Sequence, residues 1–268
     1  MNFAVDTVTA VDEAHRSYDP SCFDSLAAIE ERHFWFKARS HVISTLARQI
    51  TADLAPGYRV LEVGCGTGYV LGGLKRACPK GCVIGMDVHT EGFRYARQRS
   101  SCSLLQADVR TAPFTSTFDL IGVFDVLEHL HDDLAVLHQL HALLKPGGKL
   151  LVTVPAHPNL WSYFDEYSHH CRRYTLTDLR DKLGAAGYRP EYMTEYMAAI
   201  FGLVFMGRKF ASLRTTGKTS VQQLAAYDLK VVPVINDLLA WALSHEARWV
   251  ARRRQIPFGA SLVAIAAK

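Results

Sequence analysis

The sequence predicts an α/β protein with a mostly parallel, doubly wound sheet of seven strands and helices on both faces. Short apolar runs alternate with helix-like stretches between residues 58 and 154, as in successive strand–helix–strand units. A glycine-rich turn follows the first run, and acidic residues end later runs, where such a sheet binds its ligands. The 268 residues, 49% of them hydrophobic, are sufficient to build a sizeable core.

The glycine-rich turn follows a predicted first strand that begins at Tyr58. Gly64, Gly66 and Gly68 lie between this strand and a helix-like stretch, where glycine allows a tight bend and a close approach of ligand to backbone. The spacing is G-x-G-x-G, and Tyr69 stands where the third glycine of a dinucleotide fingerprint belongs. The turn therefore disfavours a dinucleotide ligand.

Four more apolar runs follow the turn, and three of them end in an acid. Asp87 ends the second predicted strand, 19 residues after Gly68, where a doubly wound sheet places a carboxylate for ribose hydroxyls. Asp108 ends the third strand and suits an adenine amino group, and Asp125 ends the fourth. The predicted strands are residues 82–87, 104–108, 118–125 and 150–154, with a helix closed by residues 143–149 before the last of them.

The remaining pattern is more irregular. Two helical patterns precede the first strand, and a later helix from Leu176 to Ala186 is ended by Gly187. Residues 188–196 and 261–267 predict the sixth and seventh strands. We therefore expect residues 1–57 to form an N-terminal helical lid, residues 58–197 and 257–268 the core, and residues 198–256 a helical insertion that serves as a substrate cap or an interface.

The segments between residues 58 and 156 resemble, in order, those of class I S-adenosylmethionine (SAM) methyltransferases. The resemblance implies a Rossmann-like sheet whose last strand is antiparallel, and SAM as cofactor with S-adenosylhomocysteine as product. It implies Arg39 for the methionine carboxylate and Asp125 for the methionine amino group. The cofactor-binding residues predicted in this way are Arg39, Glu62, Gly64, Cys65, Gly66, Gly68, Asp87, Val88, Asp108, Val109 and Asp125.

Three further motifs are similar to those of a bacterial biosynthetic subgroup of these enzymes. They are H-F-W-F-x-x-R at residues 33–39, H-x-R-R-Y-T at residues 170–175, and P-F-G-x-S-L at residues 257–262. His169 departs from the pattern, because the subgroup usually has glycine before the histidine. Many members of the subgroup act in polysaccharide or secondary-metabolite biosynthesis, so the resemblance implies a small biosynthetic acceptor.

Transfer of a methyl group from a sulfonium needs alignment of the acceptor and, for a hydroxyl or amine, a proton acceptor. Histidine suits this role because its ordinary pKa is ~6.5. His170 is the predicted base, with His169 as the second candidate and a structural role as the alternative. The predicted substrate-binding residues are His129, Trp161, Arg172 and Arg173, although the two arginines could instead pair with Asp165 and Glu166.

Several other functions remain open. We predict O-methylation ahead of N- or C-methylation, and the other classes are a SAM-binding protein that does not methylate and a nicotinamide oxidoreductase. A nucleic-acid substrate is disfavoured because no Asn/Asp-Pro-Pro-Tyr/Phe motif follows the fourth strand. No metal is predicted for the acids and histidines at residues 128–133, since such residues commonly begin helices.

Composition limits the partners and the compartment. The net charge is only +4, so no nucleic-acid footprint is indicated, and the arginines at 248–254 predict a solvated helix face, with an acidic substrate or peripheral membrane contact as the alternative. The longest apolar run, residues 197–206, is half of the ~20 residues that a transmembrane helix needs. Acids near the start exclude a signal peptide, and six scattered cysteines show no disulfide framework. We expect a cytoplasmic monomer or homodimer.

Overall fold

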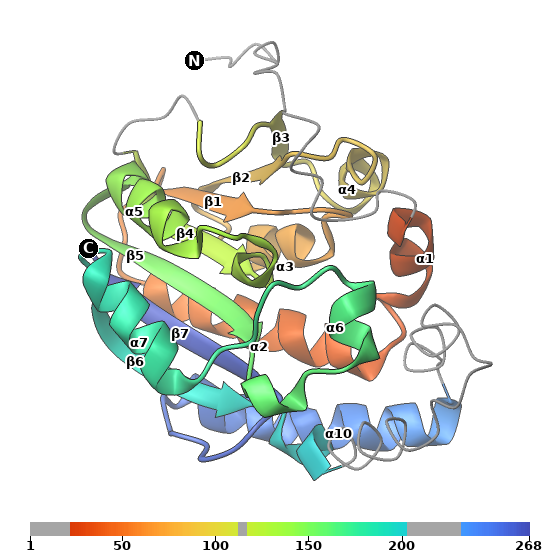
Figure 1. Ribbon diagram of the computed structural model, residues 1–268. Helices are drawn as coiled ribbons and strands as arrows, with labels where there is room; N and C mark the ends of the chain where they lie inside the picture. The colour runs from red at the N-terminus through yellow and green to blue at the C-terminus, as the bar shows by residue number, and fades with distance from the viewer. Residues whose placement is uncertain (1–21, 112–116, 203–231) are drawn as a thin grey trace.

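The computed structural model describes residues 22–111, 117–202 and 232–268, and its centre is one seven-stranded sheet (Figure 1). The strand order is β3-β2-β1-β4-β5-β7-β6. Strands β1 to β5 run parallel, whereas β7 is antiparallel to both of its neighbours, β5 and β6. The predicted fold class is confirmed, including the antiparallel last strand. The strands are β1 Arg59–Val63, β2 Cys82–Asp87, β3 Ser103–Gln106, β4 Phe118–Phe124, β5 Leu144–Pro155, β6 Arg189–Tyr196 and β7 Ser261–Ala267.

Helices cover both faces of the sheet because successive residues of each strand point to opposite sides. Leu120 of β4 packs in one apolar cluster together with α2, α3 and α10, and its neighbour Ile121 packs in the other together with α5 and α7. Both side chains are fully buried. The helices that pack on the sheet or on one another are α2 Phe34–Ile50, α3 Tyr69–Ala77, α4 Phe93–Arg99, α5 Asp133–Leu143, α7 Leu176–Ala185 and α10 Pro233–Ala251.

Four short helices lie beyond the carboxyl ends of the parallel strands or beside them. They are α1 Cys22–Ile29, η2 Leu127–His129, η3 Pro158–Leu160 and α6 Tyr163–Tyr167. Ser162 caps α6: its hydroxyl oxygen accepts from the Phe164 backbone N–H at 3.3 Å. In return, the Asp165 carboxylate accepts from the Ser162 backbone N–H at 2.9 Å. This capping box fixes the short helix in the segment that carries His170.

Two predicted boundaries differ from the structure. The third strand was expected to end at Asp108, but β3 ends at Gln106 and Asp108 follows it by two residues. Residues 143–149 were expected to close a helix before the fifth strand, but α5 ends at Leu143 and β5 already begins at Leu144. Leu144 pairs with Phe118 of β4, and a register shift follows before Leu120 pairs with Lys149. The Lys145 ammonium also donates to Asp119 at 2.7 Å. Residues 146–148, Pro-Gly-Gly, predict a turn, but pairing with β4 in the sheet draws this segment into β5.

The segment 198–256 contributes directly to the core. Its part 203–231 lies outside the described residues, but α10 packs lengthwise on α2. Asn236 of α10 accepts from the Phe34 N–H at 2.8 Å and donates to the Arg32 carbonyl at 3.0 Å. Within the described ranges no helix is both long and apolar enough to cross a bilayer.

Candidate active site

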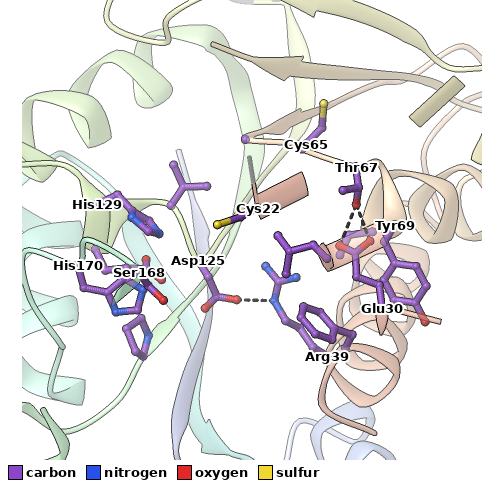
Figure 2. A pocket seen from close by; sticks show the side chains of 18 of the residues that line it. Cys22, Glu30, Arg39, Cys65, Thr67, Tyr69, Asp125, His129, Ser168 and His170 are labelled. Atoms are coloured by element: carbon purple, nitrogen blue, oxygen red, sulfur yellow. Dashed lines mark hydrogen bonds and ion pairs between the residues drawn. The ribbon is translucent and has the colours of Figure 1, made fainter. Parts of the chain in front are cut away.

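A cavity of about 680 Å³ opens at the carboxyl ends of β1, β2 and β4 (Figure 2). Its walls are the glycine-rich turn, α1, the start of α2, and the segment from α6 to His170; Leu239 of α10 also reaches it. Parallel pairing brings these strand ends together, with Val63 of β1 opposite both Met86 of β2 and Val123 of β4. The predicted site residues that line it are Arg39, Glu62, Gly64, Cys65, Gly66, Asp87, Val88, Asp108, Val109, Asp125, His129, His169, His170 and Arg173.

The glycine-rich turn has the backbone that its sequence predicts. Gly64 and Gly66 have φ angles of 73° and 48°, in the left-handed region that favours glycine. A Cβ on Gly64 would lie 2.4 Å from Cγ2 of Val126. Gly68 does not line the cavity: its φ is 74°, and a Cβ there would meet Ala96 of α4 at 2.6 Å. Gly68 thus allows α3 and α4 to pack closely.

Asp87 is held rigidly at the end of β2. Its two carboxylate oxygens accept from the N–H groups of Gly66 at 2.7 Å and His89 at 2.8 Å. Burial raises the pKa of Asp87, and these two hydrogen bonds oppose that rise. Asp108 forms an ion pair with Arg110, and both residues line the cavity beyond β3. A ligand there would contact this ion pair.

Arg39 and Asp125 form an ion pair inside the cavity, visible as the dashed line in Figure 2. The Arg39 Nη2 also donates to the Phe124 carbonyl at 2.7 Å, and its guanidinium lies 5.3 Å from the centre of the Trp35 ring. The pair therefore presents one cationic and one anionic group side by side. This arrangement is complementary to the carboxylate and ammonium of an amino acid, which fits the methionine end of SAM.

His170 is anchored by a buried carboxylate. Its Nδ1 lies 2.9 Å from Oδ1 of Asp165, which is fully buried and also accepts from Nε of Arg173 at 2.7 Å. The tautomer in which Nδ1–H donates to Asp165 leaves the second ring nitrogen, Nε2, as a hydrogen-bond acceptor. The His129 ring lies edge-on, with the ring centres 4.8 Å apart (Figure 2).

His169 differs from His170 in backbone and exposure. Its φ is 54°, the left-handed conformation that glycine adopts most easily, and its side chain is exposed. The similar subgroup usually has glycine at this position, and the positive φ explains why: glycine has no Cβ to clash in this conformation. Both histidines line the cavity, but the bond to Asp165 orients His170 alone.

The predicted substrate residues divide into two groups. His129 and Arg173 line the cavity, whereas Trp161 and Arg172 lie outside it, and Trp161 is 41% exposed. Arg172 pairs with Asp133 at 3.0 Å and donates to the His131 carbonyl at 2.8 Å. Its acid partner is therefore neither of the two expected from the sequence.

The acids and histidines at residues 128–133 have different surroundings. Asp132 caps α5 by accepting from the Ala135 N–H at 3.1 Å, as a helix N-terminus requires. Glu128 and His129 instead face the cavity, where they and His170 bring one ligand atom each within 4.8 Å of one another. These are ligand types that bind zinc and related divalent ions.

The sequence did not reveal the groups that join α1 to the glycine-rich turn. The Thr67 hydroxyl donates to the Glu30 carboxylate at 2.6 Å, and Nη1 of Arg99 donates to the same oxygen at 2.6 Å. All three groups are largely buried, and Figure 2 shows Glu30 directed at Thr67. No local motif signals this network, because its members are 32 to 69 residues apart in the chain.

The strand order and the cavity at the carboxyl ends of the strands define a doubly wound α/β fold with a ligand site at its usual place. A model of the methyltransferase domain family matches residues 32–192. The match covers more than half of the chain, so the protein belongs to this family.

Comparison with curated proteins gives relatives of moderate identity. The chain is similar to a ubiquinone biosynthesis O-methyltransferase of Xanthomonas axonopodis pv. citri, with 31% identity over 51% of this chain and 62% of the relative. It is also similar to an uncharacterized methyltransferase of Schizosaccharomyces pombe, with 31% identity over 41% of this chain and 45% of the relative. The chain thus spans less than two thirds of the length of these relatives.

Solved structures share the fold at lower identity. A SAM-dependent methyltransferase of Mesorhizobium loti has a TM-score of 0.51 and 16% identity, covering 82% of this chain and 96% of that one. The cyclase SpnF has a TM-score of 0.53 and 21% identity, covering 84% and 80%. A phosphoethanolamine N-methyltransferase of Haemonchus contortus, solved with SAM, has a TM-score of 0.52 and 18% identity, covering 92% and 60%.

Proposed function

We propose that this protein O-methylates a small, partly apolar biosynthetic intermediate, such as a secondary metabolite or a saccharide, with His170 as the base. The single observation that carries the proposal is the His170–Asp165 pair, which directs one defined ring nitrogen to a cavity that also holds the predicted SAM groups. The name of the Xanthomonas relative supports an oxygen acceptor. The H-F-W-F-x-x-R and H-x-R-R-Y-T motifs support membership of the biosynthetic subgroup.

The residues of this chain would share the work of the reaction. SAM supplies the activated methyl group. Arg39 and Asp125 hold its methionine end, while Asp87 and Glu62 bind its ribose side. As the acceptor oxygen forms its bond to the methyl carbon and the carbon–sulfur bond breaks, His170 takes the hydroxyl proton. Alignment and exclusion of water supply much of the rate enhancement.

The surrounding segments suit the proposed division of the chain. We propose residues 1–57 as a lid because α1 lines the cavity and Glu30 bonds to Thr67 of the glycine-rich turn. We propose 198–256 as part of the substrate cap because Leu239 and Ile200 line the same cavity. The core is residues 58–197 and 257–268, and the expected compartment is the cytoplasm.

His169→Gln and His170→Gln form a matched pair that tests the base. Each is incubated with SAM that carries a labelled methyl group and with a fractionated extract of the native host. We expect His170→Gln to lower kcat about 100- to 10,000-fold with an unchanged Kd for SAM, because general-base catalysis contributes in this range. Normal turnover by His170→Gln together with loss in His169→Gln would transfer the role to His169.

A SAM-binding protein without transferase activity is the second candidate, because a cyclase shares the fold. Within methyl transfer, a nitrogen or carbon atom of the acceptor could take the methyl group in place of oxygen. Label in one small organic product identifies the methylated atom and the acceptor. SAM that binds but stays intact in every fraction would contradict methyl transfer to any acceptor in the host.

A further inference from the structure

The outward face of α10 carries several large apolar side chains, although it faces away from the core. Leu243, Ala247 and Val250 on the inner side are buried in the apolar cluster that includes α2. Figure 1 shows α10 along the outside of the molecule. A surface helix normally presents polar residues on this side. The exposed fractions on the outer side are 81% for Val234, 62% for Leu238, 62% for Trp241 and 51% for Trp249.

These side chains lie on one side of the helix. Leu238 follows Val234 by four residues, Trp241 follows Leu238 by three, and Trp249 follows Trp241 by eight. The exposed His245 lies between the two tryptophans, with its ring centre 4.5 Å from that of Trp241. Large apolar groups gathered in this way mark a contact surface rather than scattered surface residues.

A basic cluster follows these apolar side chains at the carboxyl end of α10. Arg248, Arg252 and Arg254 are exposed, and the Arg254 guanidinium lies 5.3 Å from the centre of the Trp249 ring. The described residues 232–256 hold four Arg against two acids, Asp237 and Glu246, a net charge of +2. All four Arg lie within residues 248–254. Positive charge is therefore concentrated at the carboxyl end of α10.

We propose that the outer face of α10 binds the surface of an anionic lipid bilayer. Leu238, Trp241 and Trp249 would enter the interface, where the amphipathic tryptophan ring is favoured. Arg252 and Arg254 would contact the lipid phosphates, because basic residues beside an apolar stripe are attracted to acidic lipids.

The charge distribution favours a lipid surface over other partners. A second copy of the chain that packed through the same face would bring two arginine-rich segments 248–254 to one interface, where like charges repel. A nucleic acid would pair with the arginines but would leave the row from Val234 to Trp249 in water. An anionic bilayer satisfies both the apolar stripe and the basic end.

The surface is also close to the cavity. Leu239, which follows the exposed Leu238, lines the cavity from the inner side of α10. Docking would therefore place the bilayer one helix away from the site. The docking proposal itself does not depend on methyl transfer, so either can fail alone.

Flotation of the full-length protein with vesicles tests the proposal. The vesicles are pure phosphatidylcholine, or phosphatidylcholine with about a third phosphatidylglycerol, at low and at high salt. We expect binding to the anionic vesicles and weaker binding at high salt. The double variant Leu238→Ser/Trp241→Ser should bind about tenfold more weakly. Arg252→Gln and Arg254→Gln should each weaken binding about fivefold.

Arg180→Gln is the matched charge control, because Arg180 is exposed on α7, on the other face of the sheet, and should leave binding unchanged. Circular dichroism checks that each variant keeps the thermal unfolding of the wild type. The proposal is overturned if anionic vesicles do not bind the protein or bind all variants equally. It is also overturned if sedimentation shows a dimer that Leu238→Ser/Trp241→Ser converts to a monomer.

Discussion

Two carboxyl groups of the cavity, those of Glu62 and Glu128, are almost completely buried. Their exposed fractions are 2% and 1%, and Oε2 of each has no hydrogen-bond partner among the described residues. Burial raises the pKa of both well above the usual range; Arg39 partly opposes the rise at Glu62, and Asp125 adds to it at Glu128. A protonated carboxyl can donate as well as accept, so both groups suit ligand hydroxyls or amines.

The raised pKa of Glu62 predicts a stability that falls with pH. Above the ordinary glutamate pKa of 4.5 the unfolded chain has lost this proton while the folded chain retains it, so each rise in pH favours unfolding until the folded pKa is passed. Glu62→Gln removes this dependence. We expect its Tm, relative to that of the wild type, to increase between pH 5 and neutral pH, as thermal unfolding at several pH values would show. If the Tm of the wild type and that of Glu62→Gln change equally between pH 5 and neutral pH, Glu62 does not cause the pH dependence.

Glu128, His129 and His170 are also the described residues that could hold a metal ion. We expect chelation with EDTA to leave SAM binding and methyl transfer unchanged, because Asp165 already orients His170 and a sulfonium methyl needs no Lewis acid. The measurement is turnover before and after chelation. Activity that disappears and returns with one divalent ion would assign these three side chains as its ligands.

At the scale of elements, the glycine-rich turn shows how one backbone joins three elements. β1 ends at Val63, α3 starts at Tyr69, and Gly68 between them is in contact with α4. The bend requires the positive φ of Gly68, and the close packing of α4 requires that Gly68 has no side chain. Substitutions can test these two requirements separately.

Gly68→Ala and Gly147→Ala separate conformation from packing. Both glycines have φ near 75°, but a Cβ on Gly147 meets nothing within 4 Å, whereas one on Gly68 meets Ala96 at 2.6 Å. We expect Gly147→Ala to lower the free energy of unfolding by about 1 kcal/mol and Gly68→Ala by about 2–4 kcal/mol. Urea denaturation measures both, and equal losses would show that the contact with α4 is not responsible.

At the scale of the whole molecule, Asn236 connects two ends of the chain. Its amide bonds to the backbone of Phe34 and of Arg32, about 200 residues earlier, and only 6% of the residue is exposed. Through this contact α10 supports the start of α2, which lines the cavity. The segment 198–256 is therefore tied to the core as well as being a proposed cap.

Asn236→Ala should lower the free energy of unfolding by about 1–3 kcal/mol, because two partly buried backbone groups lose their partner. Thr177→Ala is the control, since Thr177 is exposed on α7 and we expect a change below about 0.5 kcal/mol. Urea denaturation compares the two variants. Similar small losses would mean that water replaces the amide at the contact between α2 and α10.

Sequence signals were sufficient where function depends on local chain geometry. The positive φ of Gly64 and Gly66, the end of α7 before Gly187 and the acid at the end of β2 follow from neighbouring residues and the strand–helix alternation. Sequence signals failed at the start of β5. Leu144 belongs to this strand because it pairs with Phe118 of β4, and the local turn residues carry no information about that pairing.

The sequence by itself determined the sheet and the glycine-rich turn, because short-range periodicity and spacing specify them, and its motifs gave the resemblance from which SAM was expected. Only the tertiary structure decided that Asp165 fixes His170, that Arg172 pairs with Asp133, and that Glu30 holds the glycine-rich turn. Such contacts join side chains whose separation in the chain does not predict their separation in space. The glycine-rich turn itself is encoded in successive residues, whereas the side chains that hold it and His170 in place come from distant parts of the chain.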